Sequence, residues 1–368
     1  MSSSTQCSEV RGLVLRALRQ PECLPQLPLR QLDLAIRVLR RAQLLAHVAW
    51  RLREAGELEQ LPAAARDAML GALVIAESRA RVARWELNRI ALALADESTV
   101  PLIALKGCAY LLAGTPNANG RVFADVDLLV PEASLERIAS QLTANGWQVL
   151  TLTPYDDNYY RVWSHELPPL KHVEREVEID LHHNVQMRTS RLRPDANLLI
   201  AKARRLHGSR YSVLSPADMV LHAMTHLFYG GEMDDALREL VDIDILLRQF
   251  STQDPRFWDG FWSRAEQLDL ARPVFYGLRY ARRLLGTPVP ESVVIASRSG
   301  APPAPVVWLM DRLVPATLFP QHPDRHRTST ALARLALYVR SHWVRMPPLM
   351  LVSHLTYKFR VRYMGHAS

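Results

Sequence analysis

Two carboxylates interrupt an otherwise apolar run in the segment RVFADVDLLVPE, which spans residues 121–132. Asp125 and Asp127 are one residue apart, so in a strand their side chains point to the same face, about 6.6–6.8 Å apart along the axis. The opposite face is apolar and suits a protein core, since it carries Val126, Leu128 and Val130. The pattern predicts a core strand with an acidic pair on one face.

The acidic pair itself predicts a bound cation. Two like charges so close raise each other's pKa, and a divalent cation removes this conflict. Mg²⁺ prefers hard oxygen ligands and typically takes one or two protein carboxylates together with phosphate oxygens. We therefore expect Asp125 and Asp127 to hold a metal ion that in turn holds a triphosphate.

A second acidic pair lies in the segment EVEIDLHHNV, residues 176–185. Glu178 and Asp180 share one face of this strand, while apolar residues occupy the other. Metal-dependent phosphoryl or nucleotidyl transfer usually needs a third carboxylate, which grips a second ion or accepts the proton of the attacking hydroxyl. The alternative for either pair alone is a solvated strand edge, but two such strands in one small sheet favour a shared site.

Hydrophobic periodicity divides the chain into three regions. Residues 1–95 read as helices, with one helix expected over 29–56 and a second helical block opening at Pro62. Residues 96–192 alternate short strands, including 100–106 and 147–153, with helices, which predicts a small mixed sheet. From residue 193 helices return, and Ser215 before Pro216 marks a helix start. The expected fold is α+β: a small mixed-sheet core between N-terminal and C-terminal helical regions, 1–95 and 193–368.

Composition narrows the class of protein. Among 368 residues, 48% are hydrophobic and 22% are charged, as in a globular protein with a sizeable core. Three cysteines, Cys7, Cys23 and Cys108, have neither metal-site nor disulfide-framework spacing, so we expect reduced thiols. The N-terminus lacks the apolar core of a secretory signal, and no uncharged 18-residue run could span a membrane. We expect a bacterial-type cytoplasmic enzyme or binding protein.

The net charge of +8 comes largely from arginines scattered over helices, where they solvate the outer faces. The tail differs, because from residue 321 onward eight Lys or Arg residues face a single acid, Asp324. Aromatic residues are interleaved there: Trp343, Tyr357, Phe359 and Tyr363. This basic tail is a candidate contact for an anionic membrane surface, a nucleic acid such as tRNA, or a partner. For the protein as a whole, nucleic acid is a possible partner but not the favoured one.

Four segments together resemble the bacterial uncharacterised nucleotidyltransferase family, within the polymerase β-like superfamily: LIALKGCAYLL, RVFADVDLLV, LTANGW and EIDLHHNV. The resemblance covers about residues 95–250, including the helix with LRELVDIDILL. It implies that Asp125 and Asp127 are the metal-binding pair and that Asp180, rather than Glu178, is the third acidic position. Gly107 matches the glycine of the strand-to-helix turn that approaches the nucleotide phosphates.

The turn before the acidic strand departs from the superfamily pattern. Lys106-Gly107 stands where Gly-Ser or Gly-Gly is usual, Cys108 follows, and the gap to Asp125 is longer than is common. The Lys106 ammonium could replace a hydroxyl contact to the phosphates, or it could be a solvated lysine at a strand end. Arg121 is a candidate for neutralising triphosphate charge; the alternative is a surface position. Cys108 has no activating base, so it is a poor nucleophile.

Four histidines and one possible ion pair are further candidates for a structural or functional role. His182 shares a strand face with Asp180 and could orient a carboxylate or substrate, whereas His183 suits a packed position. His222 and His226 have the i,i+4 spacing of zinc ligands, but Ala223 stands where such a motif has Glu, so packing is favoured. Arg238 and Asp242, also at i,i+4, predict a structural ion pair.

The leading hypothesis is a nucleotidyltransferase that uses Mg²⁺ (or Mn²⁺) to move an NMP from an NTP, such as ATP, to an acceptor hydroxyl with release of pyrophosphate. One alternative is a catalytically silent nucleotide-binding regulatory protein; another is a basic helical adaptor for RNA or a membrane surface. A sugar, an antibiotic, a protein side chain or an RNA end all suit the acceptor role, and oligomeric state stays open. Aromatic residues before the third carboxylate could wall the acceptor or merely cover the sheet: Tyr155, Tyr159, Tyr160 and Trp163.

Overall fold

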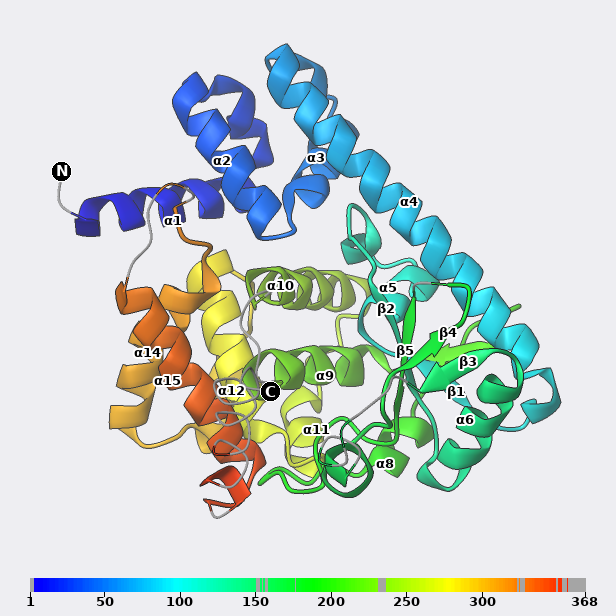
Figure 1. The fold of residues 1–368 in the computed structure, drawn as a ribbon. Helices are drawn as coiled ribbons and strands as arrows, with labels where there is room; N and C mark the ends of the chain where they lie inside the picture. Colours follow the sequence, from blue (N-terminus) through cyan, green and yellow to red (C-terminus); the bar gives the residue numbers. More distant parts are fainter. Residues whose placement is uncertain are drawn as a thin grey trace, which may run out of the picture.

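The computed structural model describes residues 3–149, 153, 155, 158–175, 177–230, 236–322, 324, 328–348, 350–352 and 356. A mixed seven-stranded sheet lies on one side of the molecule in these residues, and helices surround it (Figure 1). This arrangement confirms the α+β class. No described helix combines the length and the apolar character needed to cross a bilayer.

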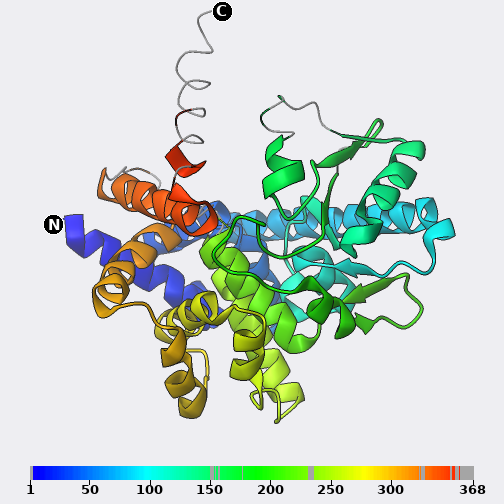
Figure 2. The same ribbon diagram turned by 90° about the horizontal axis from the view of Figure 1, so that it is seen from below.

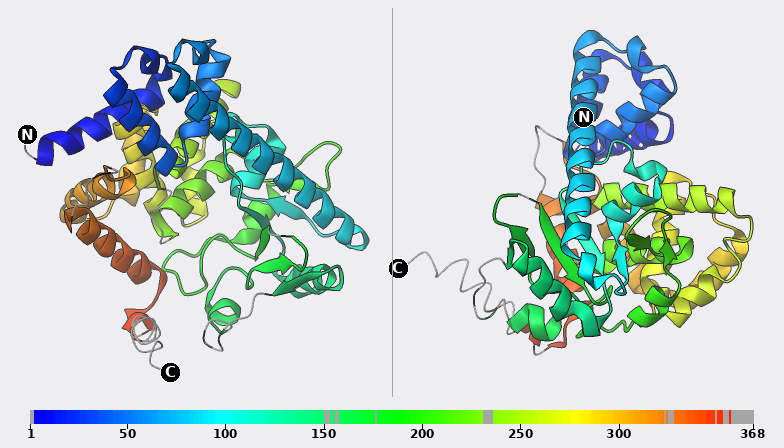
Figure 3. Two further views of the ribbon diagram at one scale, coloured as in Figure 1. Left: turned by 45° about the horizontal axis from the view of Figure 1, so that its top comes forward. Right: turned by 90° about the vertical axis from the view of Figure 1, so that its right-hand side faces the viewer.

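The N-terminal region is helical, as predicted. It contains α1 (Ser3–Arg19), α2 (Leu29–Arg41), α3 (Leu45–Glu54) and α4 (Ala63–Ala93). The prediction of one helix over 29–56 is wrong, because Gln43 adopts a left-handed backbone with φ of 56° and turns the chain between α2 and α3. Helix α4 continues from this region along the side of the sheet (Figure 3).

The strands are short and mostly buried. They are β1 (Leu102–Ala104), β2 (Asp125–Leu129), β3 (Trp147–Val149), β4 (Leu170–His172), β5 (Glu178–His182), β6 (Arg204–Arg205) and β7 (Tyr211–Val213). Their order across the sheet is β3-β4-β5-β2-β1-β7-β6. Pairs β2–β5 and β1–β7 are parallel, and the other neighbours are antiparallel. The apolar face expected for β2 is confirmed, since Val126, Leu128 and Val130 are fully buried.

The C-terminal boundary expected for the sheet is wrong. Helices alone were expected after residue 192, but β6 and β7 lie there, and β7 completes the sheet beside β1. The sheet therefore runs past the boundary expected at 192. The strand expected over 147–153 is formed over Trp147–Val149, and residues 150–152 lie outside the described part.

Helices α5 (Lys106–Ala113), α6 (Leu135–Ala144) and α8 (Ala196–Ala201) connect the strands. The C-terminal helices are α9 (Pro216–Tyr229), α10 (Ala236–Gln253), α11 (Phe261–Gln267), α12 (Ala271–Tyr280), α13 (Glu291–Ala296), α14 (Ala304–Leu318) and α15 (Thr328–Arg345). The predicted start of α9 is confirmed: the Ser215 hydroxyl accepts a hydrogen bond from the Asp218 backbone N–H at 3.2 Å. Such a cap satisfies an otherwise unpaired helix-end donor.

The described chain also contains short 3₁₀ and π turns: η1 (Pro21–Gln26), η2 (Leu58–Gln60), η3 (Ala95–Glu97), η4 (Pro116–Ala118), η5 (Glu132–Ser134), η6 (Tyr159–Trp163), η7 (Ala281–Leu285) and η8 (Ser297–Gly300).

Helices α9, α10 and α12 lie between the sheet on one side and α14 and α15 on the other (Figures 1 and 2). One continuous apolar core, from Val10 to Leu337, joins all three regions. Of the basic tail, residues 357–368 lie outside the described part.

Candidate active site

The three predicted acids converge at the centre of the sheet. The parallel register of β2 and β5 places Asp127 opposite Asp180 and Asp125 opposite Glu178. Asp125, Asp127 and Asp180 each offer one carboxylate oxygen, and these oxygens lie within 4.8 Å of one another. Asp180 lies 53 positions after Asp127 in the sequence. The expected convergence of the three acids is thus confirmed. Glu178 does not belong to this group.

Asp127 is held in place by two donors. Its carboxylate is almost fully buried, and Oδ1 accepts hydrogen bonds from Lys106 Nζ at 2.9 Å and His182 Nε2 at 3.0 Å. The second nitrogen of His182, Nδ1, lies 3.1 Å from Glu166 Oε2. Lys106 is therefore not a solvated strand-end lysine: its side chain is 23% exposed and ends on the acidic cluster. It starts α5 with a left-handed backbone, φ 44°.

The surroundings shift the pKa values of the three carboxylates in different directions. Repulsion by Asp127, together with burial, raises the pKa of Asp125. Burial and the charge of Asp127 raise the pKa of Asp180 to about 7. Burial alone would also raise the pKa of Asp127, but the Lys106 and His182 cations outweigh it and lower that pKa.

This donor set fits a divalent cation. Lys106 and His182 compensate Asp127, whereas Asp125 and Asp180 carry negative charge that their surroundings disfavour. Three carboxylates within reach of one ion offer hard oxygen ligands of the kind that Mg²⁺ and Mn²⁺ prefer. The residues present are therefore chemically suited to the predicted metal.

Gly107 lies where two segments pass very close. A Cβ atom at this position would lie 3.0 Å from Arg121 Nε and 3.3 Å from Phe123 Cδ1. The absence of a side chain therefore lets the loop before β2 pack on the start of α5. Cys108, the next residue, is buried, and burial with the nearby Asp127 charge raises its thiol pKa, which supports the expectation that it is a poor nucleophile.

Arg121 is not a surface residue, since its side chain is only 10% exposed. Its guanidinium forms an ion pair with Asp242 on α10 and lies over the Tyr110 ring, 5.4 Å from the centroid. The predicted pair between Arg238 and Asp242 is wrong: Asp242 pairs with Arg121, and Arg238 donates to Gln43 Oε1 at 2.9 Å. Helix periodicity places Arg238 and Asp242 near each other, but the loop arginine takes the buried carboxylate.

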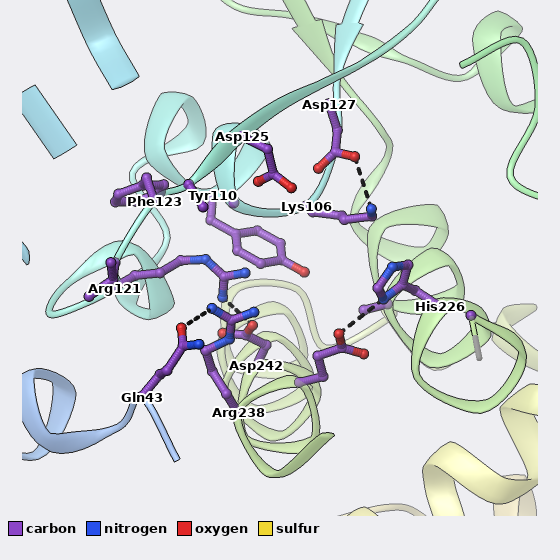
Figure 4. A pocket seen from close by; sticks show the side chains of 16 residues that line it. Gln43, Lys106, Tyr110, Arg121, Phe123, Asp125, Asp127, His226, Arg238 and Asp242 are labelled. Carbon is purple, nitrogen blue, oxygen red and sulfur yellow. Dashed lines mark hydrogen bonds and ion pairs between the residues drawn. The ribbon is translucent and has the colours of Figure 1, made fainter. Parts of the chain in front are cut away.

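A cavity of about 590 Å³ opens beside the acidic pair (Figure 4). The sheet, α5, α9, α10 and the turn between α2 and α3 all contribute to its wall. Its lining residues are Gln43, Lys106, Gly107, Tyr110, Arg121, Val122, Phe123, Ala124, Asp125, Asp127, Ala223, His226, Gly230, Arg238, Glu239 and Asp242. The volume suits a ligand of nucleotide size, since typical ligand pockets measure about 300–1,000 Å³.

Sequence reasoning missed several residues of this site. Gln43 reaches the cavity from the N-terminal region, and Glu239 lies there in contact with His226 at 3.1 Å. Tyr110 lies between Arg121 and Lys106 (Figure 4), and Glu166 reaches the cluster through His182. A conventional helix pattern surrounds each of Gln43, Tyr110 and Glu239, so no local signal marks them.

The histidine predictions are largely confirmed. His182 orients a carboxylate, although that carboxylate is Asp127 and not its own strand neighbour Asp180. His183 is buried as expected. His222 is also buried, which lowers its pKa, whereas His226 pairs with Glu239 and lines the cavity.

The aromatic residues before β5 cover another part of the structure. Tyr159 and Trp163 pack with Met187 and Met346, near the end of α15, and Tyr155 contacts the edge of the Trp163 ring. None of these residues lines the cavity described above. The described contacts of Tyr155, Tyr159 and Trp163 are thus packing contacts away from this cavity.

Comparison with known proteins places the chain in a family. A family model described as uncharacterised nucleotidyltransferase matches residues 28–286, which include α2, the acidic cluster and every lining residue of the cavity. A solved structure from H. pylori, assigned as a nucleotidyltransferase, matches at 11% identity and a TM-score of 0.30, covering 72% of this chain and 94% of that one. No curated protein matches. The resemblance inferred from the four sequence segments is confirmed, and the chain belongs to the uncharacterised nucleotidyltransferase family.

Proposed function

We propose that the protein transfers a nucleotidyl group from an NTP to the hydroxyl of an acceptor. The acceptor oxygen bonds to the α-phosphorus, and the bond from that phosphorus to the bridging oxygen of the β-phosphate breaks. Pyrophosphate leaves, and the hydroxyl proton passes to a carboxylate oxygen of Asp180. The observation that carries this proposal is the convergence of Asp125, Asp127 and Asp180 beside a cavity of nucleotide size.

Asp125, Asp127 and Asp180 would hold Mg²⁺ or Mn²⁺. When bound, the metal would supply charge neutralisation for the triphosphate and the leaving pyrophosphate. In the metal-free site, burial and the charge of Asp127 raise the pKa of Asp180 to about 7, so this carboxylate accepts a proton more readily than an ordinary aspartate.

The start of α5 is suited to phosphate. The backbone N–H groups of a helix N-terminus favour anions, and this terminus begins at Lys106 and Gly107, both on the cavity wall. The Lys106 ammonium lies on the cavity side of the acidic cluster and can exchange its contact with Asp127 for a phosphate oxygen. Catalysis of this kind depends on positioning and charge compensation and needs no covalent intermediate.

The Lys106–Asp127 ion pair favours a second candidate function, nucleotide binding without turnover. A lysine that already neutralises Asp127 lets a nucleotide bind to the start of α5 without a metal. Such a protein would bind NTPs but release no pyrophosphate with any acceptor. The raised pKa values of Asp125 and Asp180, whose negative charges a bound metal would stabilise, argue for the enzymatic function instead.

Calorimetry and a pyrophosphate assay distinguish the two candidates. Binding of ATP, GTP, CTP and UTP is measured with and without Mg²⁺, and pyrophosphate release is measured with sugars, antibiotics, proteins and RNA ends as acceptors. The transferase predicts Mg²⁺-dependent binding and acceptor-dependent release, both lost in Asp125→Asn and Asp127→Asn.

Glu136→Gln is the matched control, because this exposed glutamate on α6 carries the same charge change outside the cavity. It should behave like the wild-type protein. Metal-independent binding that persists in both aspartate variants, with no pyrophosphate release, would reject the transferase and support the silent nucleotide-binding protein.

A further inference from the structure

His182 connects two carboxylates from different segments. It is the last residue of β5, and its ring is almost completely buried. Nε2 donates to Asp127 Oδ1 at 3.0 Å, and Nδ1 lies 3.1 Å from Glu166 Oε2. The ring also contacts His165, with centroids 5.3 Å apart, so it is confined on one side.

The sheet geometry explains how these three residues meet. Leu129 on β2 lies opposite His182 in the parallel register, and Asp127 precedes it by two positions on the same strand. Side chains two positions apart share a strand face, so His182 reaches diagonally to Asp127. Glu166 pairs with His182 through an antiparallel bridge on the other edge of β5. The backbone therefore places Glu166 directly beside His182 on one side and Asp127 diagonally across from it on the other.

We propose that His182 is a positioning residue that holds Asp127 in the orientation needed for metal binding, while Glu166 orients the imidazole. The inference rests on the proposed metal-dependent function. Lys106 and His182 both donate to Oδ1 of Asp127. The other oxygen, Oδ2, is therefore the one that can bind a cation. Partners of this kind, hydrogen-bonded behind a metal ligand, typically change metal affinity 10- to 100-fold when they are removed.

His182 differs from Lys106 in what it can do for the cation. Lys106 lies on the cavity wall, so an incoming phosphate can draw its ammonium away from Asp127. His182 does not line the cavity, and Glu166 holds its second nitrogen. The His182 contact can therefore persist when ligands enter and keep Oδ2 directed toward a metal throughout a reaction.

Two isosteric variants test which nitrogen matters. Gln places its amide nitrogen near the position of Nε2, so His182→Gln keeps the donor to Asp127. Asn places its amide nitrogen near Nδ1, so His182→Asn keeps the contact with Glu166 and loses the one with Asp127. Binding of Mn²⁺ alone to the full-length protein is followed by the EPR signal of free Mn²⁺, without nucleotide or acceptor.

We expect His182→Asn to weaken Mn²⁺ binding 10- to 100-fold and His182→Gln to stay within about threefold of the wild-type protein. Glu166→Ala, which frees the ring, should weaken binding several-fold. His183→Gln is the matched control, since this neighbouring buried histidine does not contact Asp127. Melting temperatures in metal-free buffer separate folding from positioning, because a purely structural role would lower them in both His182 variants alike.

Equal Mn²⁺ affinity in the wild-type protein and His182→Asn, or equal losses in the Asn and Gln variants, would overturn the positioning role and leave the transferase proposal intact. Failure of the wild-type protein itself to bind Mn²⁺ would reject the metal-dependent function and the positioning role together. The two failures are therefore distinguishable.

Discussion

Arg121 and Asp242 form a buried ion pair that joins the loop before β2 to helix α10. Their side chains are 10% and 8% exposed, respectively, and Asn117 Nδ2 also donates to Asp242 Oδ1 at 3.3 Å. Both charged residues line the cavity. The pair therefore ties α10 to the loop that leads into the acidic strand.

Asp242→Asn should destabilise the protein by about 3 kcal/mol, because it leaves the Arg121 charge buried without a countercharge. Urea unfolding followed by circular dichroism measures the change. Asp33→Asn is the control: it removes an exposed partner of Arg37 and should change stability by less than about 0.5 kcal/mol. A loss below about 1 kcal/mol in Asp242→Asn would show that the pair is not a main support of the cavity wall.

The acidic cluster was accessible to sequence reasoning for a simple physical reason. Side chains alternate along a strand, so the positions of Asp125, Asp127 and Asp180 in apolar runs already assign them to one face of a sheet. The same reasoning placed His182 on that face. Two acidic strands in one small sheet predicted a shared site, whereas the direct pairing of β2 with β5 is set by long-range contacts that no local pattern reports.

Contacts made across the fold were not accessible in this way. The partner of Arg121 lies 121 residues further along the chain, whereas sequence reasoning could offer Asp242 only the i,i+4 neighbour Arg238. Gln43 enters the cavity because of a left-handed turn that contains neither Gly nor Pro. The strands β6 and β7 are two and three residues long, too short for a periodic pattern. Tertiary packing decided each of these features.

Asp180 should make the stability of the metal-free protein depend on pH. Its pKa rises from the ordinary value of 3.8 to about 7 in the folded state, so folding favours the protonated form. That contribution is fully present below pH 3.8 and is lost as the pH rises through 7. Asp180→Asn mimics the neutral form and should be more stable than the wild-type protein at pH 8, by on the order of 2 kcal/mol after allowance for solvent screening.

Thermal melting in EDTA between pH 4 and pH 8 measures this difference, which should shrink as the pH falls from 7 toward 4. Added Mg²⁺ should raise the melting temperature of the wild-type protein at pH 8 and have little effect on Asp180→Asn. Glu178→Gln, on the same strand outside the cluster, should retain the response to Mg²⁺. If Asp180→Asn were less stable than the wild-type protein at pH 8, this result would contradict the raised pKa of Asp180.

Gly107→Ala should lower stability and weaken NTP binding because the added methyl group crowds neighbouring side chains. The added methyl group would lie 3.0 Å from Arg121 Nε and 3.3 Å from Phe123 Cδ1, so the side chains of Arg121, which is held by Asp242, and Phe123 must move away. We expect a loss of about 1–3 kcal/mol in stability and weaker NTP binding. Gly71→Ala is the matched control in helix α4, where a Cβ meets nothing within 4 Å, and it should stabilise the protein by about 0.5–1 kcal/mol. Equal effects of the two substitutions would exclude close approach as the reason for glycine at 107.

Lys106→Met should change metal and nucleotide affinity in opposite directions. The ammonium lies 2.9 Å from a carboxylate of the acidic cluster, so its removal eliminates a competing cation and should tighten Mn²⁺ binding at least threefold. The same change removes the proposed phosphate contact and should weaken ATP binding about tenfold, or about 1.4 kcal/mol. Mn²⁺ binding is measured by EPR and ATP binding by calorimetry, with the exposed Lys202→Met as the control. If both affinities fell, Lys106 would be acting to hold Asp127 in place, as His182 does, and not as a phosphate ligand.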